Sequence, residues 1–353
     1  MKRINFKIGK TCIGADKPAF IIAEMSGNHG GSLERALEIV RAAAKSGANA
    51  VKLQTYTAHT ITLHSNAPDF QIRQGAWQKY DSLWQLYDVA HTPWEWHADI
   101  FKEARRVGLE VFSSPFDETA VDFLESLGAV AYKIASPEIN HIPLLQRVAK
   151  TKKPVILSTG VASLADLSLA VNTLREFGAG ELVILKCTSA YPAPASEANL
   201  LTIPDMMERF QAVSGLSDHS IGSVVAVAAV SLGAKVIEKH FNLENESETV
   251  DSFFSMDQSE FQKFVRDIRI AEDALGNITY DVSSSAQNSL SGMRSIYVSA
   301  PIRAGETLTR KNIRCVRPAF GLHPKYFDQV LGLRVLRDLD FGDRLKLEDI
   351  ESF

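Results

Sequence analysis

The chain has 353 residues and a formal net charge of −4 at pH 7. This length allows a barrel with an appendage, and the near balance of charges excludes a basic nucleic-acid surface or a polybasic membrane anchor. No apolar run is long enough to span a bilayer, and the first residues lack the apolar stretch of a signal peptide. Three scattered cysteines, Cys12, Cys187 and Cys315, fit neither a disulfide framework nor a zinc cluster. We therefore expect a soluble cytoplasmic protein with no nucleic-acid or membrane partner.

Short apolar runs alternate with longer amphipathic ones from Ala19 to Glu272. The apolar runs predict strands over Ala19–Ala23, Ala50–Gln54, Glu110–Ser113, Ala131–Ile134, Val155–Ser158, Leu182–Cys187, Ala212–Gly215 and Lys235–Glu238. The amphipathic runs predict helices over Leu33–Lys45, Trp94–Val107, Thr119–Leu127, Leu144–Ala149, Leu164–Phe177 and Ile221–Leu232. Eight strands alternating with helices over about 250 residues indicate a (β/α)8 TIM barrel. A doubly wound sheet is the competing fold, but its GxGxxG fingerprint is missing after the first strand.

Two segments do not follow the alternation. The connection from Thr55 to Pro93 is too long for an ordinary loop, and it would shape a substrate pocket or pack as a lid. Its aromatic and histidine side chains are His59, His64, Trp77, Tyr80, Trp84 and Tyr87. The Ser- and Asn-rich residues 280–292 predict a linker after a barrel domain of residues 1–279. Residues 293–353 contain short β-like pieces with turns, and they predict a small second domain.

Two histidines follow the last two predicted strands of the barrel. His219 and His240 each come after the carboxyl end of a strand, and a helix-length run separates the two strands. In a parallel βαβ unit both ends open on the same side of the sheet, so the two imidazoles can converge. Two neutral imidazoles suit a divalent transition metal. The alternative is that both side chains are satisfied by hydrogen bonds in the loops.

The other strand ends carry lysines, hydroxyls and two carboxylates. Lysines, serine hydroxyls and loop amides together form a cradle for a small ligand with several negative charges. The residues expected at this end of the barrel are Glu24, Lys52, Gln54, Ser114, Lys133, Ser136, Ser158, Ser189, Tyr191, Ser217 and Glu238. For Glu238, the alternative is a structural salt bridge with Lys239 or Lys235. A Schiff-base aldolase that uses Lys133 or Lys52 also remains open.

Taken together, these segments resemble the sialic acid synthase family, whose members condense phosphoenolpyruvate with an amino-sugar aldehyde. The resemblance rests on Val51-Lys52-Leu53-Gln54-Thr55, Tyr132-Lys133-Ile134-Ala135-Ser136-Pro137-Glu138, Leu157-Ser158-Thr159-Gly160, Gly215-Leu216-Ser217-Asp218-His219 and Ile237-Glu238-Lys239-His240. The tail, with Val316-Arg317-Pro318, looks like the family's antifreeze-like (SAF) domain. Within the family, Met25-Ser26-Gly27-Asn28-His29-Gly30-Gly31 and Gly321-Leu322-His323-Pro324 look most like the branch that uses 2,4-diacetamido-2,4,6-trideoxy-altrose. The branches that make N-acetylneuraminate or legionaminate are the alternatives.

The resemblance implies roles for individual residues. It implies a divalent metal (Mn2+, Mg2+ or Co2+) on His219 and His240, with Glu24 acting on a water or a sugar hydroxyl and Asp251 near the metal. It implies that phosphoenolpyruvate is held by Lys52, Lys133, Ser114, Ser136, Ser158, Ser189 and Ser217. Gln54 and Tyr191 would meet the N-acylated amino sugar. Arg317 would reach the barrel of a second subunit in a domain-swapped homodimer. A different class remains as well, in which the tail binds glycan or ice and the barrel is a scaffold.

Overall fold

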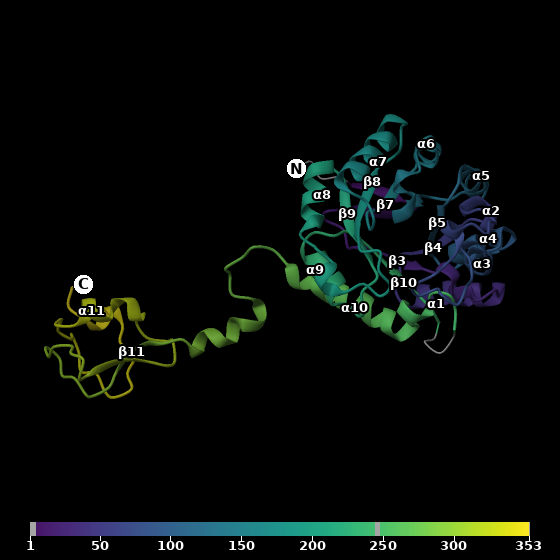
Figure 1. Ribbon diagram of the computed structural model, residues 1–353. Helices are drawn as coiled ribbons and strands as arrows, with labels where there is room; N and C mark the ends of the chain where they lie inside the picture. Colours follow the sequence, from purple (N-terminus) through teal and green to yellow (C-terminus); the bar gives the residue numbers. More distant parts are fainter. Residues whose placement is uncertain (1–4, 244–247, 353) are drawn as a thin grey trace. The chain divides into compact units, whose positions relative to one another are not determined.

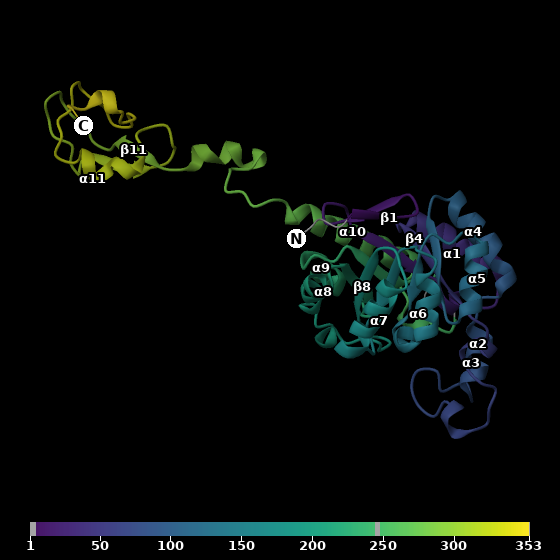
Figure 2. The same ribbon diagram turned by 90° about the horizontal axis from the view of Figure 1, so that it is seen from above.

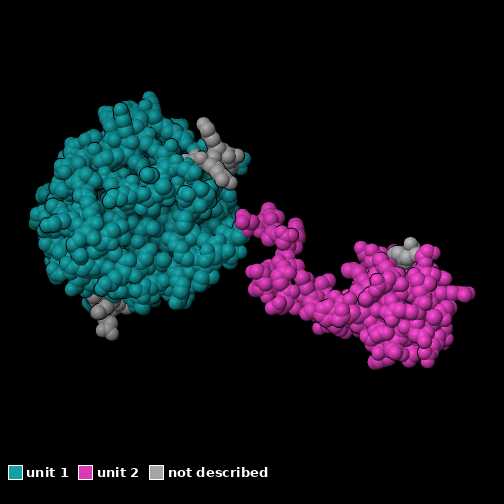
Figure 3. Space-filling model, turned by 180° about the vertical axis from the view of Figure 1, so that it is seen from behind, with its two compact units in different colours: residues 1–276 teal, residues 277–353 magenta. Residues whose placement is uncertain are grey.

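The computed structural model describes residues 5–243 and 248–352 and divides the chain into two compact units, Met1–Gly276 and Asn277–Phe353 (Figure 3). The division lies three residues before the predicted end of the barrel domain. Among the described residues, no helix combines the length and the apolar character that crossing a membrane requires.

The first unit is a closed barrel of eight parallel strands surrounded by helices (Figure 1), which confirms the predicted TIM barrel. The strands follow one another in chain order around the barrel, and the last strand pairs with the first. They are β3 (Phe20–Glu24), β4 (Ala50–Thr55), β5 (Glu110–Pro115), β6 (Tyr132–Ile134), β7 (Val155–Ser158), β8 (Leu182–Cys187), β9 (Val213–Asp218) and β10 (Val236–His240). The outer helices are α1 (Leu33–Lys45), α4 (His97–Arg106), α5 (Glu118–Ser126), α6 (Ile142–Ala149), α7 (Leu164–Glu176), α8 (Thr202–Phe210), α9 (Val224–Ser231) and α10 (Gln258–Leu275).

Helix starts and burial follow from the sequence. The Ser32 side chain accepts a hydrogen bond from the Arg35 amide and begins α1, while capping boxes at Ser163 and Asp257 begin α7 and α10. The apolar faces of these helices pack on the outside of the strands in one extended core. Because the strands are covered on both sides, they read as nearly continuous apolar runs.

One end of the barrel is closed by an N-terminal hairpin that the sequence did not predict. Strands β1 (Asn5–Ile8) and β2 (Thr11–Gly14) pair in antiparallel fashion. Their Ile8 and Ile13 side chains are buried with Phe20 and Phe112 inside the barrel. Figure 2 shows the hairpin and the α2–α3 segment at opposite ends of the barrel. Because the α2–α3 segment follows β4, the end opposite the hairpin is the carboxyl end of the strands.

The long connection between β4 and β5 is not a plain loop. It contains α2 (Ala58–Ile61) and α3 (Leu83–Ala90), with 3-10 turns at Pro68–Phe70 and Trp94–Trp96. The helix predicted from Trp94 therefore begins with a 3-10 turn and becomes α-helical only at His97. Further 3-10 turns follow other strands, at Ser26–His29, Ser136–Asn140, Ala195–Glu197 and Ser252–Phe254.

The second unit has a core of its own. Strands β11 (Ser295–Val298) and β12 (Ile313–Val316) form an antiparallel pair, and Ile296, Ile313 and Leu345 are fully buried. The other β-like pieces form isolated bridges, such as Ile302 with Leu339, rather than strands. The remaining elements are 3-10 turns at Pro324–Tyr326 and Leu347–Asp349 and α11 (Phe327–Val330). Most of the residues that predict a linker form a run of 3-10 turns, Ser284–Gly292.

Candidate active site

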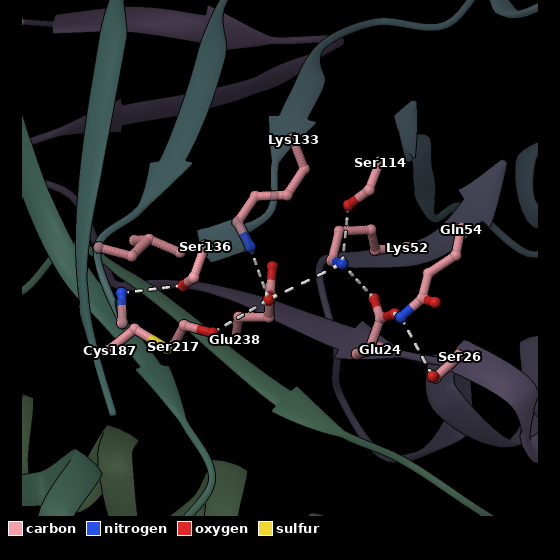
Figure 4. A network of polar contacts seen from close by, with 12 residues as sticks. Glu24, Ser26, Lys52, Gln54, Ser114, Lys133, Ser136, Cys187, Ser217 and Glu238 are labelled. Carbon is pink, nitrogen blue, oxygen red and sulfur yellow. Dashed lines mark hydrogen bonds and ion pairs between the residues drawn. The ribbon is translucent and has the colours of Figure 1, made fainter. Parts of the chain in front are cut away.

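A network of buried ionic side chains lies at the carboxyl end of the barrel (Figure 4). Glu24, Lys52, Lys133 and Glu238 come from β3, β4, β6 and β10, and each is at most 4% exposed. Four charged side chains this deeply buried are stable only when they compensate one another. The sequence predicted all four at this end of the barrel, and the structure brings them together.

Glu238 lies between two lysines. Lys133 Nζ is 3.0 Å from Glu238 Oε1, and Lys52 Nζ is 3.8 Å from the same oxygen. Burial would raise the pKa of Glu238, but the two lysines outweigh burial and lower this pKa to about 2. The expectation that Glu238 pairs with Lys239 or Lys235 is therefore wrong. Lys239 points to a different carboxylate, that of Asp218.

Glu24 is the second carboxylate of the network, and its charge is less favoured. Its Oε2 atom lies 2.6 Å from Lys52 Nζ, and its Oε1 atom accepts a hydrogen bond from Gln54 Nε2 at 3.0 Å. Burial raises the pKa of Glu24 to about 7, with Lys52 opposing and Glu238 adding to the rise. A carboxylate with a pKa near neutrality can take up and release a proton at physiological pH.

The serines of the site divide into those that have a hydrogen-bond partner and those that have none among the described residues. Ser114 accepts a hydrogen bond from Lys52 Nζ at 3.2 Å, and Ser217 donates one to Glu238 at 3.2 Å. Ser136 accepts a hydrogen bond from the Gly160 amide at 2.9 Å. By contrast, the hydroxyl oxygens of Ser158 and Ser189 are buried and have no hydrogen-bond partner among the described residues.

Gly160 allows these hydroxyls to approach one another. A Cβ atom at this position would lie 2.1 Å from Ser189 Oγ and 2.9 Å from Ser136 Oγ. Buried hydroxyls without partners are unfavourable unless a ligand completes them. Beside two lysines, they suit the oxygens of a phosphate or a carboxylate.

His219 and His240 do converge, as the strand ends predicted. Their ring centroids are 5.3 Å apart. His219 directly follows β9, whereas His240 is the last residue of β10 rather than the first residue after it. Facing imidazoles at the open end of a barrel can share one ligand.

The nitrogen atoms of both rings suit a cation. The Thr188 carbonyl lies 2.9 Å from His219 Nδ1, so this nitrogen acts as the donor, and in the neutral ring the lone pair is on Nε2. Burial lowers the pKa of His240 well below its usual value, with His219 and Lys52 adding to the effect, and its Nδ1 atom has no partner among the described residues. Within the described part of the chain, no group of three or more His, Cys, Asp or Glu side chains is arranged to hold a metal ion. A cation on the two histidines would therefore take its remaining ligands from water or substrate.

Aromatic side chains surround the histidine pair. The Tyr191 ring lies 4.4 Å from that of His219, and the Phe254 ring lies 4.7 Å from that of His240, between centroids. Trp77, from the long β4–β5 connection, reaches this group with its ring 5.6 Å from Tyr191. Its indole N–H donates to the Val250 carbonyl at 3.1 Å.

Other aromatics of the same connection pack among themselves. His59 and His64 contact Trp84, with ring centroids 4.1 and 4.8 Å away, so these three side chains pack against one another. Tyr87 packs against Tyr56, with 5.7 Å between the centroids.

Sequence reasoning missed several residues of the site. Ser26 donates to the buried carboxylate of Asp251 and accepts from Gln54 Nε2 at 3.1 Å. Phe254 and Cys187 also line the site, with Cys187 Sγ 3.9 Å from His219 Nδ1. None of the three carries a local sequence signal, because their neighbours come from distant strands. Arg317 is exposed in the second unit, directly after β12.

Known proteins with similar sequences and structures show the family of the chain. Residues 39–280 match the model of the NeuB family, and residues 293–351 match that of the SAF domain. The chain is 46% identical over 95% of its length to pseudaminic acid synthase of Campylobacter jejuni subsp. jejuni serotype O:23/36 (strain 81-176), 97% of which is covered. It is 42% identical over 95% of its length to pseudaminic acid synthase of Helicobacter pylori (strain ATCC 700392 / 26695), 98% of which is covered.

A solved structure is also similar over most of both chains. It is N-acetylneuraminic acid (sialic acid) synthetase from Leptospira borgpetersenii serovar Hardjo-bovis, in complex with citrate. The TM-score is 0.72 at 28% identity, with 82% of this chain and 95% of that one covered. Family models match both the barrel and the tail domain, and the relatives match over nearly their full length. The chain therefore belongs to the NeuB family.

Proposed function

We propose that this chain condenses phosphoenolpyruvate with 2,4-diacetamido-2,4,6-trideoxy-L-altrose, releases phosphate by C–O cleavage and forms the nine-carbon 2-keto acid pseudaminic acid. The observation that carries the proposal is the buried cradle beside the histidine pair. The cradle contains Lys52 and Lys133, and also the hydroxyls of Ser158 and Ser189, which have no partner among the described residues. The choice of sugar rests on the identity to the two pseudaminic acid synthases.

The cradle would hold the phosphate and carboxylate of phosphoenolpyruvate. Lysines supply charge-assisted contacts, and the serine hydroxyls supply the remaining hydrogen bonds. The residues proposed for this task are Lys52, Lys133, Ser114, Ser136, Ser158, Ser189 and Ser217. The burial of the two lysines excludes bulk water from them, which strengthens their contacts.

Glu24 is proposed as the proton-transfer residue. Because the pKa of Glu24 is about 7, its ionised form accepts a proton from the water that adds to the phosphate-bearing carbon or from a sugar hydroxyl. Gln54 donates to Glu24 and orients it, and Tyr191, beside His219, would contact the sugar.

His219 and His240 are proposed to hold a divalent cation, Mn2+ or Mg2+, with Co2+ as a further candidate. Their adjacent rings and, in the neutral ring of His219, the lone pair on Nε2 fit such a cation. When bound, the cation supplies Lewis-acid polarisation of the sugar's aldehyde oxygen. Asp251, which is buried and bonded to Ser26, would support the water or sugar near this pair.

Three further proposals concern the whole chain. We place the catalytic barrel at residues 1–279, the linker at 280–292 and the SAF domain at 293–353. We also propose a domain-swapped homodimer, in which Arg317 of one subunit grips the N-acyl sugar in the barrel of the other. Its planar guanidinium suits amide carbonyls and hydroxyls.

A second reaction class is favoured by one observation. Burial lowers the pKa of Lys133, as a Schiff-base aldolase would require. Its ion pair with Glu238 argues against this role, because the pair holds the amine protonated. Borohydride trapping of a substrate adduct on Lys133 would support the aldolase.

The deciding experiment measures phosphate released from phosphoenolpyruvate with three sugars. These are N-acetylmannosamine, the altro-configured 2,4-diacetamido-2,4,6-trideoxy sugar and the 6-deoxy precursor of legionaminate. We expect release with the altro sugar, loss of release in chelator and recovery with Mn2+. A strong preference for either other sugar would reassign the branch. Full activity of His240→Ala in chelated buffer would exclude the two-histidine site.

A further inference from the structure

A second buried ion pair lies directly behind the histidines, outside the network of Glu24 and Glu238. Asp218 is the last residue of β9, and Lys239 is its register partner on β10. Each immediately precedes one of the two histidines in sequence. Lys239 Nζ lies 2.8 Å from Asp218 Oδ2, and the side chains are 1% and 2% exposed.

The pair faces away from the histidines. Lys239 Nζ lies 5.8 Å from the centroid of the Phe264 ring on α10, in the helical layer, whereas the two histidine rings lie beside each other and that of His219 lies beside Tyr191. Successive side chains of a strand point to opposite sides, which accounts for the difference between Lys239 and His240. The pair therefore takes no part in binding substrate directly.

Ser220 joins the pair and completes what we call the strand clamp, made of Asp218, Ser220 and Lys239. Asp218 Oδ1 accepts hydrogen bonds from the Ser220 amide at 2.9 Å and from the Ser220 hydroxyl at 2.6 Å. Lys239 Nζ also donates to the Ser220 carbonyl. His219 thus has a clamp residue on either side, and the clamp ties the backbone around it to the residue before His240.

Close packing of the two strands restricts them further. A Cβ atom at Gly215 would lie 1.9 Å from the Val236 carbonyl, so only glycine permits this approach of β9 to β10. The strands are fixed below the histidines by Gly215 and at the level of the histidines by the clamp.

Stability alone does not account for a buried pair at this place. Replacing a buried ion pair with well-packed apolar side chains is often neutral or stabilising, so such a pair is weak evidence for stability. In the described part of the chain, the other ion pairs with both side chains below 5% exposure all belong to the Glu24 and Glu238 network of the site. The clamp differs from them because it contacts the backbone around a histidine instead of lining the site.

We propose that Asp218 and Lys239 are positioning residues, which set the separation and orientation of the two imidazoles and thereby the affinity of the site for a divalent cation. This inference rests on the proposed cation site. Partners behind metal ligands commonly change metal affinity by about 10- to 100-fold when they are removed.

The test is a titration of chelator-stripped, full-length protein with Mn2+, in which the free ion is followed by its paramagnetic resonance signal. Lys239→Met and Asp218→Asn should each weaken Mn2+ binding by about 10- to 100-fold. Binding of phosphoenolpyruvate without metal should stay within about twofold, because its proposed contacts lie on other side chains. Lys239→Arg should restore part of the Mn2+ affinity, since it keeps the charge.

Lys263→Met is the matched control. It removes an ion pair of similar length on α10, 2.6 Å to Asp267, in which Lys263 is 62% exposed. It should leave Mn2+ binding unchanged. Asp218→Asn preserves side-chain shape, so it decides the question if Lys239→Met does not fold.

The outcomes separate this inference from the cation site itself. If His240→Ala loses Mn2+ binding while Lys239→Met and Asp218→Asn bind it like the unmodified protein, the clamp does not position the histidines, whatever happens to the melting temperature. If His240→Ala and the unmodified protein bind Mn2+ alike, the two-histidine site is wrong, and this inference fails with it.

Discussion

At the scale of single residues, the site is governed by how its charges compensate one another. Glu238 shares its Oε1 atom with Lys133 and Lys52, and Lys52 also pairs with Glu24. An anionic substrate must therefore bind to lysines that already form ion pairs with Glu24 and Glu238. This arrangement fixes the lysine side chains before the substrate arrives, so less side-chain entropy is lost on binding.

Removing Lys133 should weaken phosphoenolpyruvate binding selectively. Lys133→Ala should raise the KM for phosphoenolpyruvate by about 10- to 100-fold, because a charge-assisted contact contributes roughly 1.5–3 kcal/mol. The KM for the sugar should move less. Steady-state kinetics with each substrate varied in turn give both values. Lys150→Ala, at an exposed position just after α6, serves as the control. A change confined to the sugar would contradict the assignment of Lys133.

Glu24 should give the reaction a pH dependence near neutrality. Because burial raises the pKa of Glu24 to about 7, the ionised fraction and hence kcat should increase as pH rises through this value. Glu24→Gln should lower kcat by about 100-fold or more and remove this limb of the profile. Persistence of the limb in Glu24→Gln would assign it to another group.

The stability of the protein should respond to Glu24 in the opposite direction. Its pKa is higher in the folded chain than the usual 4.5, so between these values the folded state binds more protons than the unfolded state. Glu24 therefore makes the protein less stable as pH rises through this window. A gain in activity as pH rises through this window therefore does not come from stabilisation of the fold by Glu24. Thermal melts across the same pH range measure this change in stability.

At the scale of elements, the sequence identified the eight barrel strands but not all of their ends. Strands β9 and β10 extend beyond the predictions to Asp218 and His240, because the polar residues that complete them break the apolar pattern while the ladder of hydrogen bonds continues. Helices α8 and α10 were missing from the predicted set. The ring of site residues was predictable because the carboxyl ends of barrel strands converge.

Which residues pair with one another was not predictable. Lys133 and Glu238 are 105 positions apart and meet only because their strands share a barrel. The nearest charged residues in sequence, Lys239 and Lys235, are therefore poor guides to the partners of Glu238. The N-terminal hairpin was missed for a similar reason, since its few apolar residues have meaning only against the barrel interior.

Within the β4–β5 connection, Trp77 should affect the sugar and Trp84 should not. Trp77 packs on Tyr191 beside the histidines, whereas Trp84 packs on His59 and His64. Trp77→Leu should raise the KM for the sugar by about 5-fold, because an aromatic contact contributes around 1 kcal/mol beyond its buried area. The KM for phosphoenolpyruvate should change little.

Trp84→Leu is the matched control for this experiment, since it removes the same side chain from the same connection. Steady-state kinetics of both variants, with thermal melts to confirm folding, separate the two roles. Equal effects of the two substitutions on the sugar would mean that the whole segment acts only as a packed lid.

At the scale of the whole molecule, the second unit is expected to complete the site of another subunit. Arg317→Ala and His240→Ala should each be nearly inactive as separate proteins. Mixed and reassembled, they should regain activity, because one site of each mixed dimer combines an intact barrel with an intact arginine. Random exchange would restore about a quarter of the sites. Subunit exchange is verified with differently tagged chains. No recovery despite exchange would place the action of Arg317 within its own chain, or nowhere.

The closure of the barrel has a consequence for how the enzyme comes into being. Strand β10 pairs with both β9 and β3, so the last barrel strand to be synthesised meets the first barrel strand. That same strand brings Glu238 between Lys52 and Lys133, and it brings His240 to His219. On the ribosome, the first seven barrel strands therefore emerge before β10. At that stage Lys52 and Lys133 lack Glu238, their shared counter-ion. The step that seals the barrel also assembles the ionic network and the histidine pair, so a nascent chain that ends before β10 has a nearly complete scaffold but no active site.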